Sequence, residues 1–339
     1  MNSPAANPPP LRILFWESTT RCNLDCTHCR RVDPDISKNE LTTREVEKVF
    51  ESTTSLGRPM IIFSGGEPLV RKEWEHMAMF AQKLEFPTAL ATNGTLIDRK
   101  IADQINAAGF RRVSVSIDGA DSETHDRFRG VPGCFDLAQR GIDLLLGTGT
   151  RVQINVTVTR RNIDQVKAIY QNSVERGIEA MHLFMLVPVG CGASIGETDQ
   201  LSPLQYEQML SWIYHEQSKA PIELRATCAP HYNRIAGDPG PGCLAGISVI
   251  FLSHTGEVFP CGYLPVSCGS VRETTLPEIW RNSTLLAELR NRSLLKGKCG
   301  CCQFRQTCAG CRARAFAATG DYLQEEPACI YMAQETEIK

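Results

Sequence analysis

The sequence predicts an α/β fold: a partial, TIM-like barrel of six β/α units, followed by a smaller cysteine-rich domain. Short apolar runs alternate with helical patterns over residues 11–187. Each crossover helix returns the chain to the same edge of the sheet, so consecutive strands are expected to run parallel. Six units are fewer than the eight of a closed barrel. The second domain is indicated by nine of the 15 cysteines, which lie from Cys243 onward.

The expected elements follow one another through the first half of the chain. The β-rich apolar runs cover residues 11–16, 60–64, 88–92, 112–117, 153–158 and 180–186, and the helical patterns cover 43–55, 72–85, 97–108, 134–147 and 163–176. Thr42 and Glu45 have the spacing of a capping box before the first helix. In such folds the chemistry lies at the carboxyl ends of the strands.

The second half has a different texture. Ser202 and Gln205 predict a capped helix to about residue 219, and residues 222–226 form a short strand. His254-Thr255-Gly256 predicts a hairpin between residues 248–252 and 257–260. We therefore divide the chain into a disordered tail (1–10), a core (11–187), a bridging segment (188–242) and a cysteine-rich domain with a C-terminal tail (243–339).

Charge and hydropathy argue against two classes of partner. The chain has 36 basic and 38 acidic residues, which leaves no electrostatic footprint for nucleic acid. Its apolar runs are far shorter than the ~20 residues that span a bilayer, and residues 1–10 lack the features of a signal peptide. We expect a cytoplasmic protein. In that reducing compartment, clustered thiols indicate metal rather than disulfides.

Cys22, Cys26 and Cys29 lie within eight residues of one another. A cubic iron–sulfur cluster normally takes one protein thiolate on each of its four irons. Three thiolates would leave the fourth iron open, so that it could chelate and reduce a small molecule. A structural zinc site is the alternative that the spacing leaves open, although His28 lies too close in sequence to complete a tetrahedron easily.

Small polar residues and glycines follow the second, third and fourth expected strands. Gly65, Gly66 and Glu67 come directly after residues 60–64. Two glycines let a ligand approach the backbone, and a carboxylate can accept hydrogen bonds from an ammonium group. Each turn alone could be a simple glycine turn or a helix cap. Together they indicate a site for an amino acid or a ribose, and the other two turns are Thr92-Asn93-Gly94-Thr95 and Ser116-Ile117-Asp118-Gly119.

The three-cysteine loop and the strand-end turns resemble the radical S-adenosylmethionine (SAM) family over about residues 11–187. In that family the open iron of a [4Fe-4S] cluster binds the amino and carboxylate groups of SAM. An electron from the cluster then releases a 5′-deoxyadenosyl radical, which abstracts hydrogen from the substrate. The resemblance also implies a reducing partner such as flavodoxin or ferredoxin.

The resemblance implies particular contacts to SAM. Gly65, Gly66 and Glu67 would contact the methionine amine. Arg127 would meet the carboxylate, with Arg129 as a rival, because guanidinium suits carboxylate. Further polar contacts would come from Ser116 and Asn155.

The C-terminal cysteines are similar to the SPASM auxiliary-cluster domain over about residues 243–329. The gap of two residues before Cys311 departs from the usual three. The resemblance implies one or two auxiliary [4Fe-4S] clusters. One would be held by Cys299, Cys302, Cys308 and Cys329. The other would be held by Cys243, Cys261 and Cys311, with Cys228 as the expected fourth ligand, Cys268 as the alternative, and an open iron also conceivable. The remaining cysteines, Cys134, Cys191 and Cys301, are expected to be bystanders.

Residues 225–234 and 242–246 resemble haem-biosynthetic SPASM enzymes, above all the haem-synthase family of the siroheme-dependent pathway. That resemblance implies oxidative decarboxylation of two propionates of iron-coproporphyrin III to the vinyls of haem b. An auxiliary cluster could accept the electron that each decarboxylation releases. The substrate carboxylates would need cations. The candidates are Arg225, His231, Arg234 and Arg314, although each could be an ordinary surface charge.

Three alternatives remain open. A related tetrapyrrole enzyme, a didecarboxysiroheme deacetylase or one of the haem d1 type, would use the same cofactors. A SPASM peptide maturase is the second, although the 21 residues before Cys22 leave no room for a peptide-binding domain. The third, from another class, is a non-catalytic iron–sulfur or zinc scaffold, which predicts no 5′-deoxyadenosine from SAM.

Overall fold

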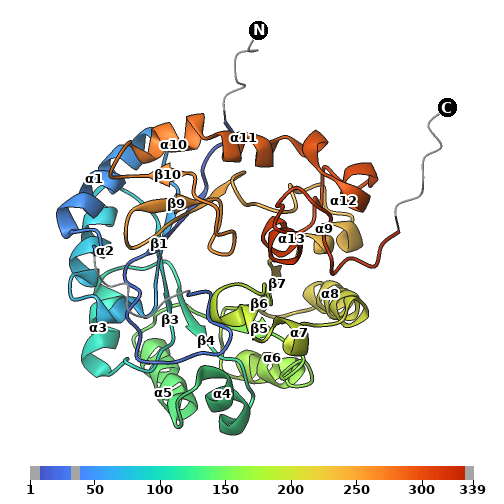
Figure 1. The fold of residues 1–339 in the computed structure, drawn as a ribbon. Coiled ribbons are helices and arrows are strands. Elements are labelled where there is room, and N and C mark those ends of the chain that lie inside the picture. Colours follow the sequence, from blue (N-terminus) through green and yellow to red (C-terminus); the bar gives the residue numbers. More distant parts are fainter. Residues whose placement is uncertain (1–7, 32–38, 333–339) are drawn as a thin grey trace, which may run out of the picture.

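A computed structural model describes residues 8–31 and 39–332 of the chain, and the strands of this part form a single sheet (Figure 1). Its order is β10-β9-β8-β1-β2-β3-β4-β5-β6-β7. Neighbours from β8 through β1 to β7 pair in parallel, and only β8–β9 and β9–β10 are antiparallel. The strands are β1 Ile13–Glu17, β2 Met60–Ser64, β3 Thr88–Thr92, β4 Val113–Ser116, β5 Val152–Val158, β6 Ala180–Met185, β7 Glu223–Thr227, β8 Val249–Leu252, β9 Glu257–Phe259 and β10 Gly269–Ser270.

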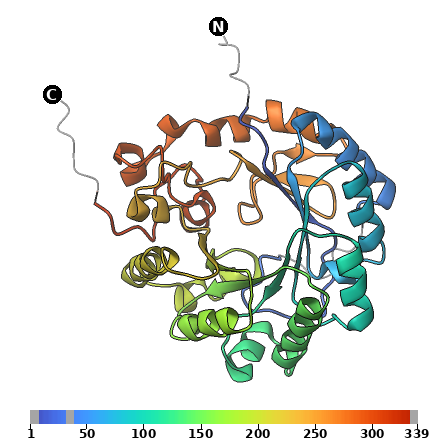
Figure 2. The same ribbon diagram turned by 180° about the vertical axis from the view of Figure 1, so that it is seen from behind.

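Helices surround the curved sheet, and those of the N-terminal half of the chain lie on its outer side (Figure 1). Seen from behind, the C-terminal elements complete the ring between the β1 side and the β7 side (Figure 2). The helices are α1 Thr43–Thr53, α2 Trp74–Lys83, α3 Arg99–Ala107, α4 Ser122–Arg129, α5 Cys134–Gly147, α6 Val166–Glu175, α7 Gly196–Asp199, α8 Pro203–Gln217, α9 His231–Ala236, α10 Leu276–Asn282, α11 Thr284–Arg290, α12 Gly297–Cys301 and α13 Arg312–Thr319.

The partial barrel contains more parallel strands than the six predicted. β7 extends the sheet beyond β6, and β8 pairs with the opposite side of β1. Every residue of β8 is buried, as is typical of a strand covered on both faces. The sheet therefore runs through the bridging segment and into the cysteine-rich part of the chain. The sequence pattern also predicted no element where α4 lies.

The core supports the strand ends that carry the candidate site at one edge of the sheet. Trp16 of β1 packs edge-on against Phe63 of β2, with ring centroids 5.2 Å apart, and against Phe50 of α1 at 5.5 Å. The three side chains are fully buried. Aromatic pairs of this geometry add to the free energy gained by burial. This packing therefore stabilises β1 and the position at which the following loop begins.

Of the expected N-terminal tail (1–10), residues 1–7 lie outside the described residues. Pro9, inside the expected tail, is ordered: its carbonyl accepts a hydrogen bond of 3.1 Å from Trp280 Nε1. The expected C-terminal tail is described only to residue 332. Among the described residues, no helix has the length and apolar character needed to cross a membrane.

Candidate active site

The loop that carries Cys22, Cys26 and Cys29 leaves the end of β1 and rests directly on the glycine turn after β2. The Gly66 N–H donates to Thr19 O at 2.7 Å, and the Glu67 N–H donates to Arg21 O at 2.8 Å. A Cβ on Gly66 would lie 2.4 Å from Arg21 O, which no real side chain tolerates. We expected these glycines to admit a ligand. The close approach that the structure shows is instead made by the chain's own backbone.

Two further elements hold the same loop. The N–H groups of Asp25 and Thr27 donate to the carbonyls of Arg129 and Phe128 at the end of α4, both at 3.2 Å. On the other side, Asn23 reaches the end of β3, where its side-chain amide donates to Thr95 Oγ1 at 2.7 Å. The loop is therefore held by the ends of β2, β3 and α4.

Each thiol of the loop accepts an N–H. Leu24 N donates to Cys22 Sγ at 3.4 Å, Arg31 N to Cys29 Sγ at 3.5 Å, and Arg129 Nη1 to Cys26 Sγ at 3.7 Å. Burial raises the pKa of Cys22, and it raises that of Cys26 to about 11. The hydrogen bonds suit thiolates, and a bound cation is what would keep buried sulfurs ionised.

The arrangement fits an iron–sulfur cluster better than zinc. The thiols of the loop lie close enough to influence one another's pKa. Over residues 8–31 and 39–332, however, no three His, Cys, Asp or Glu side chains converge on a point where one metal ion would sit. Separate irons of a cluster need no such convergence, because each takes its own thiolate. A tetrahedral zinc site does need it.

Glu67 is fully buried, and its carboxylate ties the ends of β2 and β3 together. Oε1 accepts from Thr92 Oγ1 at 2.8 Å and from Leu69 N at 3.1 Å, and Oε2 accepts from Asn93 N at 2.8 Å. Burial raises the pKa of Glu67 to about 7 against these hydrogen bonds. In this structure the carboxylate thus holds the strand ends, and its contact to a methionine amine stays a prediction.

Ser116 and Asn155 are brought side by side, since they are paired in register on β4 and β5. The two candidate arginines of α4 are separated. Arg127 lies on the exposed face of the helix, whereas Arg129 is buried against the cysteine loop. Residues two positions apart on a helix face different directions, and which of the two arginines contacts the SAM carboxylate stays a prediction.

Two site residues were not assigned any role from the sequence. Asp118, which is fully buried, forms an ion pair with Arg129 and accepts from Thr157 N at 2.7 Å. His28, which is half-buried, packs against Phe128 with ring centroids 4.4 Å apart, and its Nε2 lies 3.8 Å from Asp118 Oδ2. Asp118 belongs to the strand-end turn after β4, so the turn itself was the available signal.

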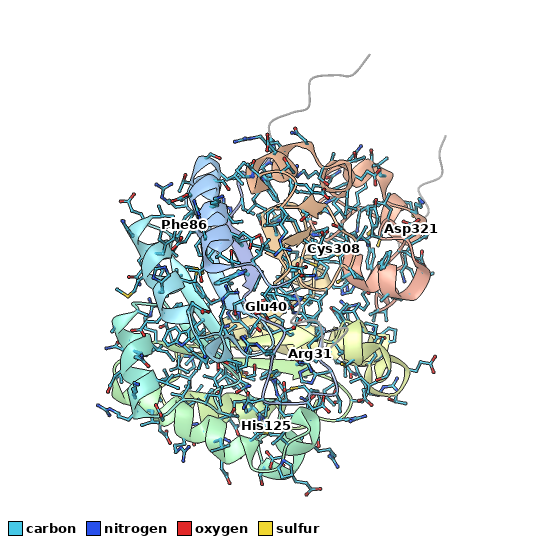
Figure 3. The ribbon with its side chains drawn as sticks, turned by 60° about the vertical axis from the view of Figure 1, so that its left-hand side comes forward. Arg31, Glu40, Phe86, His125, Cys308 and Asp321 are labelled. Atoms are coloured by element: carbon cyan, nitrogen blue, oxygen red, sulfur yellow. The ribbon has the colours of Figure 1, made fainter. Side chains whose placement is uncertain are left out.

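An open cavity of about 400 Å³ borders the cysteine loop. Figure 3 shows Arg31, one of its lining residues, near the middle of the molecule, with Cys308 in the C-terminal part above it. The lining residues are Arg21, Cys22, Asn23, Leu24, Asp25, Arg31 and Val131. Arg21 and Arg31, whose guanidinium groups suit carboxylates, therefore line the cavity together with Cys22.

The C-terminal cysteines gather into two groups. We call Cys228, Cys243, Cys261 and Cys311 the first thiol set. Burial raises the pKa of Cys228 well above its usual value, and after burial the nearby thiols of the other three members raise it further. Cys268 belongs elsewhere, because its thiol interacts with Ser283 and Arg290. The structure therefore brings Cys228, rather than Cys268, to this set.

The second thiol set consists of Cys299, Cys302, Cys308 and Cys329. Burial raises the pKa of Cys308 to about 12, and the thiols of Cys329 and Cys299 contribute to the shift. The thiol of Cys302 likewise raises the pKa of Cys299. Both sets are thus the ones expected from the sequence, although their binding of iron remains a prediction.

A buried ion pair lies between the two sets. Arg314 Nε donates to Glu326 Oε1 at 2.8 Å, and both side chains are almost completely buried. The Glu326 N–H donates to Cys299 Sγ at 3.4 Å, and its Oε2 accepts from Cys311 N at 2.7 Å. Arg314 also donates to Cys228 O at 2.7 Å. One carboxylate and one guanidinium therefore fix parts of both sets.

The four cations predicted for substrate carboxylates are mostly engaged otherwise. Arg314 donates its hydrogen bonds to protein groups. Arg234 Nη2 donates to both carboxylate oxygens of Glu207, at 2.5 and 2.7 Å, and Arg225 pairs with Glu223 at 2.7 Å. His231 is buried, and burial lowers its pKa to about 4, so it is uncharged at neutral pH. Three of these candidates are thus held by protein groups and the fourth is uncharged, and their contact to a substrate carboxylate stays a prediction.

The three cysteines that we expect to be bystanders make their hydrogen bonds outside the two thiol sets. Cys134 donates to Asp126 Oδ1 at 3.2 Å, Cys191 to Arg31 O at 3.3 Å, and the exposed Cys301 to Gly297 O at 3.8 Å. Cys191 nevertheless packs beside the loop of the first three cysteines.

Comparison with known proteins agrees with this geometry. The Radical SAM superfamily matches residues 16–172, and the SPASM iron-sulfur cluster-binding domain matches residues 243–312. The crystal structure of Streptococcus suis SuiB bound to S-adenosylmethionine has a TM-score of 0.76 at 18% identity, over 96% of this chain and 78% of that one. At that identity the likeness concerns the fold alone.

Two relatives from Methanosarcina barkeri match nearly the whole chain. AdoMet-dependent heme synthase is 44% identical over 94% of this chain and 96% of its own length. Fe-coproporphyrin III synthase is 32% identical over 95% of this chain and 88% of its own.

The fold and the cysteine loop define a radical SAM enzyme that carries a SPASM domain. That class implies a [4Fe-4S] cluster, SAM and auxiliary iron–sulfur clusters as cofactors. The chain belongs to the radical SAM superfamily and, within it, to the family of the AdoMet-dependent heme synthases.

Proposed function

We propose that this protein converts iron-coproporphyrin III to haem b by oxidative decarboxylation of two propionates. The observation that carries the proposal is the 44% identity to an AdoMet-dependent heme synthase over nearly the full length of both chains. A shared cysteine loop alone would support only the superfamily. Identity of this level over 94% of this chain, well beyond the cysteine loop, supports the substrate class as well.

The change at each propionate can be balanced. The side chain loses one hydrogen atom from its β-carbon, then carbon dioxide and one electron, and becomes a vinyl group. The [4Fe-4S] cluster with SAM supplies the 5′-deoxyadenosyl radical that takes the hydrogen atom. The eight thiols of the two sets suit auxiliary clusters, which are one-electron groups.

The chain's own residues have proposed roles. Cys22, Cys26 and Cys29 hold the SAM-binding cluster, and the two thiol sets hold auxiliary clusters. Gly65 and Gly66 keep the cysteine loop against the strand ends where SAM would lie. The polar residues proposed around SAM are Glu67, Ser116, Asn155 and, in place of Arg127, Arg129.

Removal of acetate groups from a related tetrapyrrole is the second candidate, because Fe-coproporphyrin III synthase is also similar over most of the chain. Its lower identity, 32% against 44%, favours decarboxylation.

The experiment incubates the anaerobically reconstituted, reduced protein with SAM and iron-coproporphyrin III. Mass spectrometry of the porphyrin is expected to show two propionates converted to vinyls, with carbon dioxide and two 5′-deoxyadenosine molecules released per haem. A porphyrin that returns unchanged would contradict the proposal, and release of acetate from didecarboxysiroheme would support the second candidate.

We further propose a reducing, cytoplasmic setting and a low-potential donor such as flavodoxin or ferredoxin. Support comes from the 15 unpaired cysteines of the chain, since clustered free thiols persist where disulfides are disfavoured.

A further inference from the structure

Arg30 directly follows Cys29, and its side chain reaches across to the C-terminal part of the sheet. The guanidinium carbon lies 4.2 Å from the ring centroid of Phe251 on β8. The same side chain passes over Gly262, where a Cβ would lie 3.7 Å from both Arg30 Cδ and Nε. Gly262 is the neighbour of Cys261 in the first thiol set. Arg30 therefore lies between the SAM-cluster loop and that set.

The first thiol set lies on the far side of this place. Tyr263, the residue after Gly262, packs with Cys228 and Cys261 against the small buried cluster that contains Cys311. A substrate that gives a hydrogen atom on the SAM side and an electron on the auxiliary side is expected to lie between the SAM-cluster loop and this set.

Arg30 has donors to spare there. Its Nη2 lies 3.1 Å from Glu17 Oε1, yet this buried nitrogen makes no hydrogen bond of acceptable geometry. Guanidinium carries five N–H donors in a fixed fork. Glu17 is also shared, because its Oε2 accepts from His254 Nδ1 at 2.7 Å. The ion pair with Glu17 thus orients Arg30 without using its whole fork.

The direction of the Arg30 side chain favours a substrate carboxylate over the carboxylate of SAM as its ligand. The proposed SAM contacts lie at the ends of β2 to β5. Arg30 turns the other way, toward Phe251 and Gly262. A stacked guanidinium with a free edge suits bidentate binding of a carboxylate. In addition, the four cations expected for this task from the sequence are either paired or uncharged.

We propose that Arg30 binds a propionate carboxylate of the tetrapyrrole substrate and so positions the porphyrin between the SAM cluster and the first thiol set. This assignment rests on the proposed function.

The test uses Arg30→Gln and Arg30→Lys in the reconstituted protein, with Arg99→Gln as the control, because Arg99 is an exposed arginine paired with Asp103. Affinity is measured by absorbance titration with iron-coproporphyrin III and with its tetramethyl ester. Wild type is expected to bind the free acid at least tenfold more tightly than the ester. Arg30→Gln should lose that preference, Arg30→Lys should keep part of it, and Arg99→Gln should behave as wild type.

Iron content and SAM cleavage without porphyrin are measured in parallel. Unchanged porphyrin affinity in Arg30→Gln would overturn the assignment, as would a loss of SAM affinity with porphyrin binding intact, since that would make SAM the carboxylate ligand. If Arg30→Gln loses iron, Phe251→Leu decides: it removes the ring beneath the guanidinium, and an unchanged preference for the free acid would overturn the assignment.

The two proposals fail separately. Wild-type protein that binds the porphyrin through Arg30 but releases no carbon dioxide would overturn the proposed function and support the assignment of Arg30. Decarboxylation by Arg30→Gln at an unchanged KM for the porphyrin would support the proposed function and overturn the assignment of Arg30.

Discussion

The two cysteine regions of this molecule are assembled in different ways. The N-terminal loop takes its three thiols from eight consecutive residues, and backbone contacts at strand and helix ends hold it. The C-terminal region takes eight thiols from residues 228–329, and the fold brings them together around a buried ion pair. A local motif with three thiols leaves an iron open for chemistry, whereas two sets of four suit closed clusters that carry electrons.

The largest effect is expected from breaking the local region. Cys26→Ala removes one of three thiolates from the SAM cluster. We expect 5′-deoxyadenosine formation to fall to background, as measured by chromatography after reduction with dithionite. The exposed Cys301→Ala is the matched control and should retain activity. Equal cleavage of SAM by both variants would contradict a catalytic role for the loop.

A second substitution separates the two regions. Cys228→Ala is expected to lose about four irons per chain and to stop haem formation, while SAM cleavage without substrate continues. The reason is that the first thiol set would lose a ligand and the cysteine loop would not. Cys268→Ala, measured by the same iron and product assays, should match wild type. The opposite ranking of these two variants would show that the wrong fourth cysteine is assigned.

The ion pair between the sets provides an intermediate effect on stability. Glu326→Gln leaves the buried Arg314 charge uncompensated, which should cost about 3–5 kcal/mol of the free energy of unfolding. Asp321→Asn removes a partner of Lys296 at the surface and should cost about 0–1 kcal/mol. Urea unfolding under anaerobic conditions compares the two. Equal losses would mean that the Glu326 pair does not hold the sets together.

The smallest effect concerns the helix cap of α10. Hydrogen bonds from Thr275 and Thr274 lower the pKa of Glu278 to about 2, below its usual 4.5. Because the folded-state pKa is depressed, the stabilisation is present above about pH 4.5 and is lost as the pH falls toward 2. Glu278→Gln should therefore be less stable than wild type at pH 6, and urea titrations should show the difference shrinking at pH 4. A pH-independent difference would contradict this.

Much of the barrel could be predicted from sequence, because its signals are local. The strands Met60–Ser64 and Thr88–Thr92 and the helix Cys134–Gly147 have the bounds expected from their apolar patterns. The addition of β7 and β8 to the sheet could not be predicted in this way. β8 pairs with a strand more than 230 residues earlier, and no spacing within either segment encodes that partner.

The candidate site divides along the same line. The cysteine loop is a local motif, and the resemblance to known families supplied the thiol sets. The choice of cations for the substrate carboxylates stays a prediction, because the ion pairs that limit each arginine are visible only in the fold. Arg314 faces Glu326 and Arg129 faces Asp118 across short stretches of neighbouring chain, and the spacing of these residues in the sequence does not show that they pair. Asp118 itself was visible in a strand-end turn, but its role depends on the arginine that α4 brings to it.

The most direct test of the contrast between the regions is the iron and sulfide content of the anaerobically reconstituted wild-type protein. One open cluster and two complete sets of four thiols predict about 12 irons per chain. A content of about eight would mean that one of the two thiol sets holds no cluster, and about four would mean that the C-terminal thiols bind none.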